Sequence, residues 1–216
     1  MPFDINQKVF NRYGEFDEKK ARAYQDQLLQ LFDASPEAQA LAEEDIQPGW
    51  VSMMIEFGFD YLGVSPAQMT PSNLREILFD LFPRKVSAQP DEAPDIIREL
   101  QAFWQFMQRE FHLANAAANL AILDDRAIRQ LKKEMSNPAN FGIAKSFVMM
   151  GMAQGFDMST EEGMNTWMNT YNAGIASGTQ PRIPLPGEQS ASTRQYRDKI
   201  KRKMKKDSRR RNRNKS

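Results

Sequence analysis

Apolar residues recur at steps of three and four along most of the chain, which is the spacing of one face of an α-helix. The clearest run extends from Ile96 to Phe111, with polar residues such as Arg98 and Glu99 assigned to the opposite, solvated face. Shorter runs of the same kind lie in residues 17–32, 74–82 and 164–171. Because almost no stretch alternates with the period of a strand, the pattern predicts an all-α fold of roughly seven to nine helices.

Capping residues mark where several of these helices are expected to begin and end. A serine, threonine or asparagine before a proline is typical of a helix start, because the first side chain caps free N–H groups and proline fits the first turn. Such pairs occur at Ser35-Pro36, Ser65-Pro66, Thr70-Pro71 and Asn137-Pro138. Ser159 and Glu162 have the spacing of a capping box. Glycine commonly follows a helix end, so we expect ends at Gly63, Gly155 and Gly174.

The segment from Trp50 to Leu62 is apolar at nearly every position, which is typical of a central, buried helix. Its polar stripe is Ser52, Glu56 and Asp60, spaced at four residues. Two interpretations follow. Glu56 and Asp60 would form a carboxylate site between helices, acting as acid and base or holding a hard cation, with Arg84 or Lys85 nearby. Alternatively, the stripe is the one solvated edge of the helix, which avoids the cost of burying carboxylates.

Two further candidates for chemistry are weaker. His112 could act as a general base together with the nearby Glu110. Alternatively, it lies near a helix C-terminus, where a histidine interacts favourably with the helix dipole. The segment from Asn137 to Ser146 ends in Lys-Ser, as phosphate-binding loops do, yet it lacks the first glycine and has Ala144 before Lys145. A helix N-terminus there would still attract an anion, and Lys145 is otherwise interpreted as structural or surface-exposed.

Methionine is concentrated between residues 149 and 168, with Gly151, Ala153 and Gly155 among the methionines. One interpretation is a core in which glycine lets two helices approach closely. The other is an adaptable surface for a partner helix, since methionine side chains are flexible and polarizable. On the second interpretation the partner-binding residues are Met149, Met150 and Met152.

The 29 basic and 28 acidic residues are unevenly distributed. Residues 194–216 contain 13 basic and two acidic residues, a charge of +11, which leaves −10 on residues 1–193. The sequence therefore predicts an acidic all-α domain over 1–174, a Pro/Gly/Ser linker over 175–192 and a basic tail over 193–216, disordered or partly helical.

The basic tail is the strongest functional signal in the sequence. A dense run of Lys and Arg favours binding to phosphates of RNA, DNA or a nucleoprotein such as the ribosome, with low sequence specificity because Tyr196 is the tail's only aromatic residue. The alternatives are a tail that folds back on the acidic body, a nuclear import signal in a eukaryotic cell, and a membrane-surface segment, for which the apolar stripe is too thin. The predicted polyanion-binding residues are Lys199, Lys201, Arg202, Lys203, Lys205, Lys206, Arg209, Arg210, Arg211 and Arg213.

Composition narrows the function classes. The chain has no cysteine and a single histidine, which excludes thiol nucleophiles, disulfides, zinc fingers and sites that need two imidazoles. We therefore predict no metal and no cofactor. The absence of a long apolar run and of a signal-like start favours a cytoplasmic protein without a membrane span.

Three stretches resemble segments of bacterial all-helical proteins that have no assigned activity: 81–87, the Phe103-Trp104 pair and 137–146. The resemblance implies a bacterial cytoplasmic protein and no particular chemistry. The leading hypothesis is a non-enzymatic helical module that binds a protein partner through its body and a polyanion through its tail. The alternatives are an enzyme with a carboxylate site and a regulatory protein whose tail closes on its own body.

Overall fold

The computed structural model describes residues 3–9 and 17–179. Within these residues every regular element is a helix, which confirms the all-α prediction. They divide into two compact units: 3–9, 17–83 and 88–136 form the first, and 84–87 and 137–179 form the second. The predicted basic tail and most of the predicted linker lie outside the described residues.

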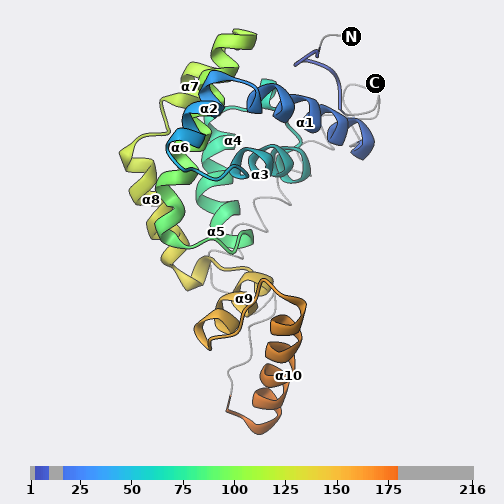
Figure 1. Cartoon of the computed structure of the whole chain (residues 1–216), viewed down its shortest axis with the longest axis vertical. Helices are drawn as coiled ribbons and strands as arrows, with labels where there is room; N and C mark the ends of the chain where they lie inside the picture. The colour runs from blue at the N-terminus through green and yellow to red at the C-terminus, as the bar shows by residue number, and fades with distance from the viewer. Residues whose placement is uncertain (1–2, 10–16, 180–216) are drawn as a thin grey trace, which may run out of the picture. The chain divides into compact units, whose positions relative to one another are not determined.

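Figure 1 shows the order of the elements. The first unit contains α1 (Glu18–Asp33), α2 (Pro36–Glu43), α3 (Trp50–Phe57), the π-helix η1 (Gly58–Leu62), the 3-10 turn η2 (Pro66–Gln68), α4 (Pro71–Glu76), the π-helix η3 (Ile77–Leu81), the start of α5 (Phe82–Lys85), the 3-10 turn η4 (Pro90–Glu92), α6 (Ala93–Phe111), α7 (Ala116–Leu120) and α8 (Asp125–Ser136). The second unit contains the end of α5, the 3-10 turn η5 (Pro138–Asn140), α9 (Ile143–Ala153) and α10 (Glu161–Ser177).

The number of helices agrees with the sequence-based expectation. Several elements follow one another without a gap: α3 continues into η1, α4 into η3 and α5, and η4 into α6. Counted in this way, the described part of the chain holds nine helices besides the short turns η2 and η5. This is the upper end of the predicted number.

Helix α6 is the centre of the first unit. It packs against α2, α3, α7 and α8, which surround it in Figure 1. The inward side chains recur at the predicted steps of three and four and are excluded from solvent: Ile96, Ile97, Leu100, Phe103, Trp104 and Met107. Phe103 also contacts Phe32 of α1 edge to face, with ring centroids 5.4 Å apart. The helical period therefore identified most of the side chains that α6 contributes to the core of this unit.

Glu99 of α6 corrects one part of that prediction. The sequence assigned it to the solvated face, yet only 1% of its surface is exposed. The reason is a neighbouring helix: α3 begins at Gly49, which has no side chain to cap the free N–H groups of the first turn. The Glu99 carboxylate supplies that cap from another helix, so a charged residue is stable in the interior.

The predicted helix starts and ends are correct in part. Ser35 and Thr70 cap α2 and α4, whereas Ser65 and Asn137 begin the 3-10 turns η2 and η5. The expected capping box at Ser159 is wrong by one residue, because Thr160 caps α10 and Ser159 instead donates to Asp157. The expected end at Gly174 is also wrong. Helix α10 continues to Ser177, and the left-handed residue that ends it is Gly178, with φ +74°.

Candidate functional site

Helices α9 and α10 form a hairpin that is held together at a glycine. A Cβ atom added to Gly151 would lie 2.4 Å from Sδ of Met158 and 2.8 Å from Cδ1 of Trp167. Both of those side chains are buried. Because Gly151 has no side chain, the indole of Trp167 can pack directly against α9. This is the close approach of two helices that the glycines among the methionines predicted.

Trp167 organises the interior of this hairpin. Its Nε1 atom donates a hydrogen bond of 2.9 Å to the carbonyl oxygen of Phe147, so the indole is satisfied although it is fully buried. The rings of Phe147, Phe156 and Tyr171 lie around it with centroids 5.4–5.7 Å away. This aromatic cluster fixes the two helices against each other.

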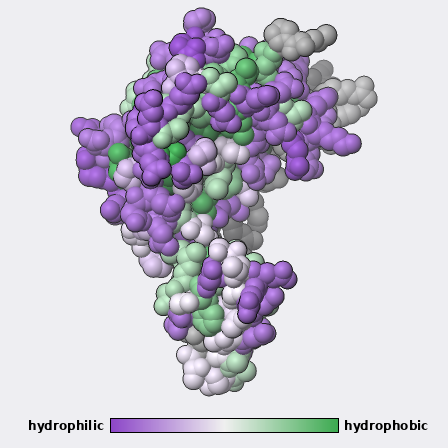
Figure 2. Space-filling model, viewed as in Figure 1, coloured by the Kyte–Doolittle hydropathy of each residue, from purple (hydrophilic) through white to green (hydrophobic). Residues whose placement is uncertain are grey.

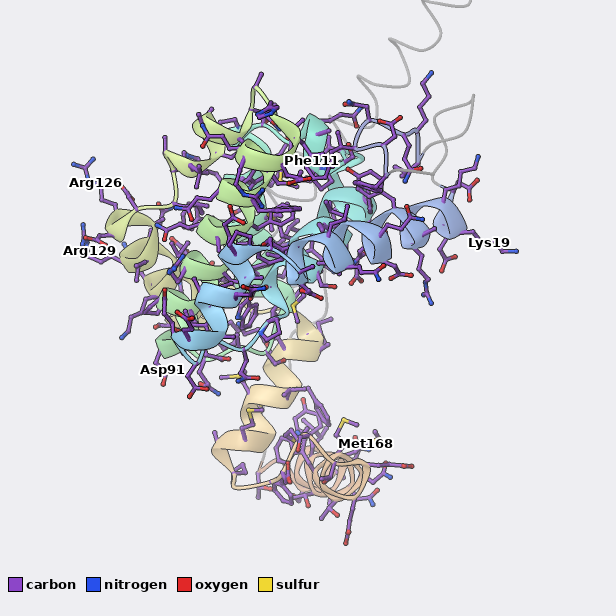
Figure 3. All side chains as sticks on the ribbon, turned by 45° about the horizontal axis from the view of Figure 1, so that its top comes forward. Lys19, Asp91, Phe111, Arg126, Arg129 and Met168 are labelled. Carbon is purple, nitrogen blue, oxygen red and sulfur yellow. The ribbon has the colours of Figure 1, made fainter. Side chains whose placement is uncertain are left out.

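The hairpin nevertheless leaves large apolar side chains in solvent. Met152, Met164 and Met168 are 39%, 41% and 47% exposed, and we call them the hairpin methionines. Met149 and Met150 of the predicted partner-binding set are half-buried. Met164 and Met168 lie one turn apart on α10, and Figure 3 shows Met168 beside that helix. Of the predicted partner-binding set, Met152 is thus the exposed member, and the exposed methionines extend to α10.

The surface of α10 is also unusual in its charge. From Gly163 to Ser177 the helix contains no acidic or basic residue. Two hydroxyls that would interact with water instead donate to carbonyls of their own helix, Thr166 to Glu162 at 2.8 Å and Thr170 to Thr166 at 2.9 Å. Figure 2 accordingly shows large white and pale green areas over α9 and α10. Beyond its acidic first turn, α10 therefore presents exposed methionines and neutral polar side chains, with no charge to be desolvated when another surface covers them.

Glu56 and Asp60 line an open groove of about 420 Å³ in the first unit. Both are exposed. Across the groove α1 supplies two further carboxylates and one guanidinium, so the groove has a net negative charge. Its lining residues are Glu18, Ala21, Arg22, Gln25, Asp26, Glu56, Phe59 and Asp60. The stripe is attached to α1 through Gln25, whose Nε2 donates to Oγ of Ser52 at 2.9 Å.

His112 is the residue that ends α6. It is exposed and adopts the left-handed conformation, with φ +50° and ψ +37°. The neighbouring Glu110 accepts a hydrogen bond of 2.9 Å from Nη1 of Arg109. His112 therefore has the position of a helix C-cap, which the sequence placed correctly near a helix end.

Glu99 was missed as a special residue by sequence reasoning. Its Oε1 atom accepts from the backbone nitrogens of Gly49 and Val51, both at 3.0 Å, and Oε2 accepts from Trp50 at 3.1 Å. Burial raises the pKa of the Glu99 carboxyl, and the three N–H donors oppose that rise. The only sequence signal was Gly49-Trp50, a helix start without a capping side chain.

Lys145 is the other buried charge among the described residues, and the sequence interpreted it as structural or surface-exposed. Only 2% of the residue is exposed, and its Nζ atom has no hydrogen-bond partner among the described residues. It lies 4.4 Å from the centre of the Phe141 ring, at the beginning of α9. Burial lowers its pKa to about 8. The charge of a lysine in this state is poorly compensated.

The ten predicted polyanion-binding residues lie outside the described residues. Within residues 3–9 and 17–179, no helix has the length and apolar character needed to cross a membrane, and no three or more His, Asp or Glu side chains are placed to hold a metal ion. No protein-family model, curated protein or solved structure matches the chain.

Proposed function

We propose that the protein is a non-enzymatic helical module that binds a protein partner through the α9–α10 hairpin and a polyanion through residues 193–216. The observation that carries the proposal is the division of charge: +11 on residues 194–216 against −10 on the rest of the chain. A dense run of lysine and arginine contacts phosphates without reading bases, so the ligand would be RNA, DNA or a nucleoprotein.

The protein-partner half of the proposal is supported by the hairpin methionines. Monomeric proteins tolerate single exposed apolar residues, but a charge-free stretch of helix that carries Met164 and Met168 one turn apart favours contact with an apolar partner surface. Methionine adapts its shape to the partner more readily than branched side chains do. The tail would then supply affinity for the polyanion, and the hairpin would supply specificity.

Salt-dependent binding tests the polyanion half. The full chain is titrated into a labelled single-stranded RNA of 30 nucleotides by fluorescence anisotropy at several salt concentrations. If the tail neutralises about six phosphates, the slope of log K against log salt is about −4. Replacing the ten predicted tail residues by Gln is expected to remove most of that slope. An unchanged slope in this variant contradicts the proposal.

Helix α8 offers a matched control for the charge change. Arg126, Arg129, Lys132 and Lys133 are all exposed on it, and Figure 3 shows the two arginines projecting away from the helix. Replacing these four by Gln removes basic charge from the folded body without touching the tail. The slope is expected to stay close to that of the unmodified chain.

The protein-partner half is tested by affinity capture from cell extract with and without nuclease. Met164→Gln with Met168→Gln is expected to lose those partners that survive nuclease treatment, while RNA binding is unchanged. Thr166→Ser with Thr170→Ser, on the same helix, serves as the control because it keeps the hydroxyl bonds to the helix backbone. Equal capture by both variants would remove the hairpin from the proposal.

The two alternatives remain predictions and have their own signatures. If the tail closes on the acidic groove, Glu56→Gln with Asp60→Gln weakens that contact and tightens RNA binding. If these carboxylates belong to an enzyme, the same variant leaves RNA binding unchanged and abolishes a reaction yet to be identified.

A further inference from the structure

The start of α9 combines features that a helix N-terminus rarely has together. Its N-cap is Gly142, so there is no capping side chain, and its first turn contains no acidic residue. In place of an acid it contains Lys145, a cation at the positive end of the helix dipole. Both features destabilise the start of α9 unless negative charge comes from elsewhere.

The N–H groups of Ile143, Ala144 and Lys145 donate no hydrogen bond to any described residue. The N–H of Gly142 donates to the carbonyl oxygen of Arg84 at 2.9 Å, and the first bond within reach of α9 is that of Ser146 to Gly142. Three adjacent donors are therefore available at the end of the helix. Ala144 is exposed, so solvent reaches this turn.

The Lys145 side chain points back toward these donors. Side chains of a helix lean toward its N-terminus, and Nζ of Lys145 lies 4.4 Å from the ring centre of Phe141, the residue before the N-cap. The ammonium therefore lies against the residue that directly precedes the N-cap of α9. Only 2% of the surface of Lys145 is exposed, and its ammonium has no hydrogen-bond partner among the described residues.

The other glycine-capped helix of this chain shows how such an end is completed. Among the described α-helices of eight or more residues, α3 and α9 alone have neither their own capping side chain nor an acid in the first turn. In α3 the carboxylate of Glu99 accepts from three consecutive N–H groups. No described carboxylate does this for α9, where a lysine adds positive charge instead.

We propose that the N-terminus of α9 is a binding site for a phosphate group, held by the N–H groups of Ile143, Ala144 and Lys145 and by the Lys145 ammonium. Three N–H donors and an ammonium match the oxygens and the double charge of a phosphate monoester or of inorganic phosphate. This site is independent of the tail.

Phe141 has to move for the site to be filled. Without a ligand, its ring lies over the ammonium and partly compensates the charge. Because Nζ has no contact with solvent, an entering phosphate displaces this half-buried ring. Binding then replaces a weak cation–π contact by charge-assisted hydrogen bonds, which are the stronger interaction.

Thermal unfolding of the full chain tests the site with inorganic phosphate at pH 7, against sodium chloride of equal ionic strength. Phosphate is expected to raise the melting temperature of the second unit, followed through the indole resonance of Trp167. Lys145→Met is expected to weaken phosphate binding by at least about tenfold. It should also melt higher than the unmodified protein in chloride, because a buried unpaired cation has been removed. Lys132→Met on α8 is the control and should behave like the unmodified chain.

A second measurement does not depend on any variant. In a phosphate titration followed by ¹⁵N NMR, the amide signals of Ile143, Ala144 and Lys145 are expected to shift together with one dissociation constant. Phenyl phosphate is titrated in parallel. A response to phosphate alone indicates a site for the free anion, and a response to both indicates a phosphoryl group on a larger molecule. Absence of shifts at α9, or equal stabilisation of Lys145→Met by phosphate, overturns the proposal.

Discussion

Oε1 of Glu99 lies 3.0 Å from the backbone nitrogen of Val51, and this hydrogen bond joins the middle of α6 to the start of α3. The same oxygen accepts from Gly49. A carboxylate that caps a helix from a distant part of the chain serves two purposes at once: it satisfies orphan N–H groups, and it fixes where α3 begins relative to α6. The position of the apolar helix from Trp50 to Leu62 therefore depends on one charged side chain.

Replacing Glu99 by Leu is expected to destabilise the first unit by about 2–4 kcal/mol, since three N–H groups lose their acceptor, one buried and two partly buried. Glu99→Gln keeps one oxygen but turns an NH₂ group toward a donor, and it is expected to cost about 1–2 kcal/mol. Urea denaturation followed by circular dichroism measures both. Gln105→Leu, at an exposed position of α6, should change stability by less than about 0.5 kcal/mol. If Glu99→Leu is as stable as this control, the cap has no energetic role.

Helical spacing was enough to locate most of the fold. The run that begins at Ile96 became α6 with its predicted buried face, and the apolar segment from Trp50 to Leu62 became α3 and η1 with the predicted bounds. Ends were less predictable because competing caps lie side by side. Thr160 replaces Ser159 as the cap of α10, and Gly178 replaces Gly174 at its end, since local hydrogen bonds decide between neighbouring residues of similar type.

The candidate sites were less accessible to sequence reasoning. Glu99 falls on the polar face of α6 by its spacing, and only the packing of α3 against α6 makes that position internal. Lys145 lies three residues after a glycine N-cap, where position alone suggests a surface lysine. Burial of a charged residue results from long-range packing, which helical periodicity does not encode. Met168 is the opposite case. The apolar spacing of residues 164–171 predicted that it faces inward, but it is exposed on α10.

Gly151→Ala should destabilise the hairpin although alanine is the better helix former. Helix propensity favours the change by about 1 kcal/mol, but the new methyl group would lie within 3 Å of both Met158 and Trp167. Overpacking of this kind costs about 1–3 kcal/mol, so the net effect is a loss. The Trp167 indole resonance in a urea titration reports it. Adding Met158→Ala should give back part of the loss, and a Gly151→Ala protein as stable as the original would show that the indole can move aside.

His112→Gly is expected to stabilise α6. A residue other than glycine in the left-handed conformation is strained by about 1 kcal/mol, and His112 has φ +50°. Glycine relieves this strain, and its greater freedom in the unfolded chain offsets part of the gain. Thermal unfolding should therefore show a net gain of a few tenths of a kcal/mol up to about 1 kcal/mol. A clear loss would mean that the imidazole makes an important contact.

The stability of the second unit should rise with pH through the titration of Lys145. Its pKa is about 8 in the folded protein and 10.5 in the unfolded chain, so the unfolded chain binds more protons between these values. The sign follows from linkage: stability increases as pH rises wherever the unfolded state is the more protonated. The burial cost of the ammonium is fully present below pH 8 and absent above about pH 10.5.

This pH dependence is best measured as a difference between two proteins, because every residue other than position 145 is common to both. Lys145→Met is expected to exceed the unmodified chain in stability by on the order of 3 kcal/mol at pH 7, and the gap should narrow as pH rises toward 10.5. Urea unfolding in chloride buffers, read through ¹⁹F-labelled Trp167, gives this difference for the second unit. Phosphate at pH 7 should also narrow the gap. It stabilises the unmodified protein by pairing with the Lys145 ammonium, whereas Lys145→Met has no ammonium to pair with. A gap that stays constant from pH 7 to pH 10.5 would mean that Lys145 has the same pKa in both states and is not buried as a charge.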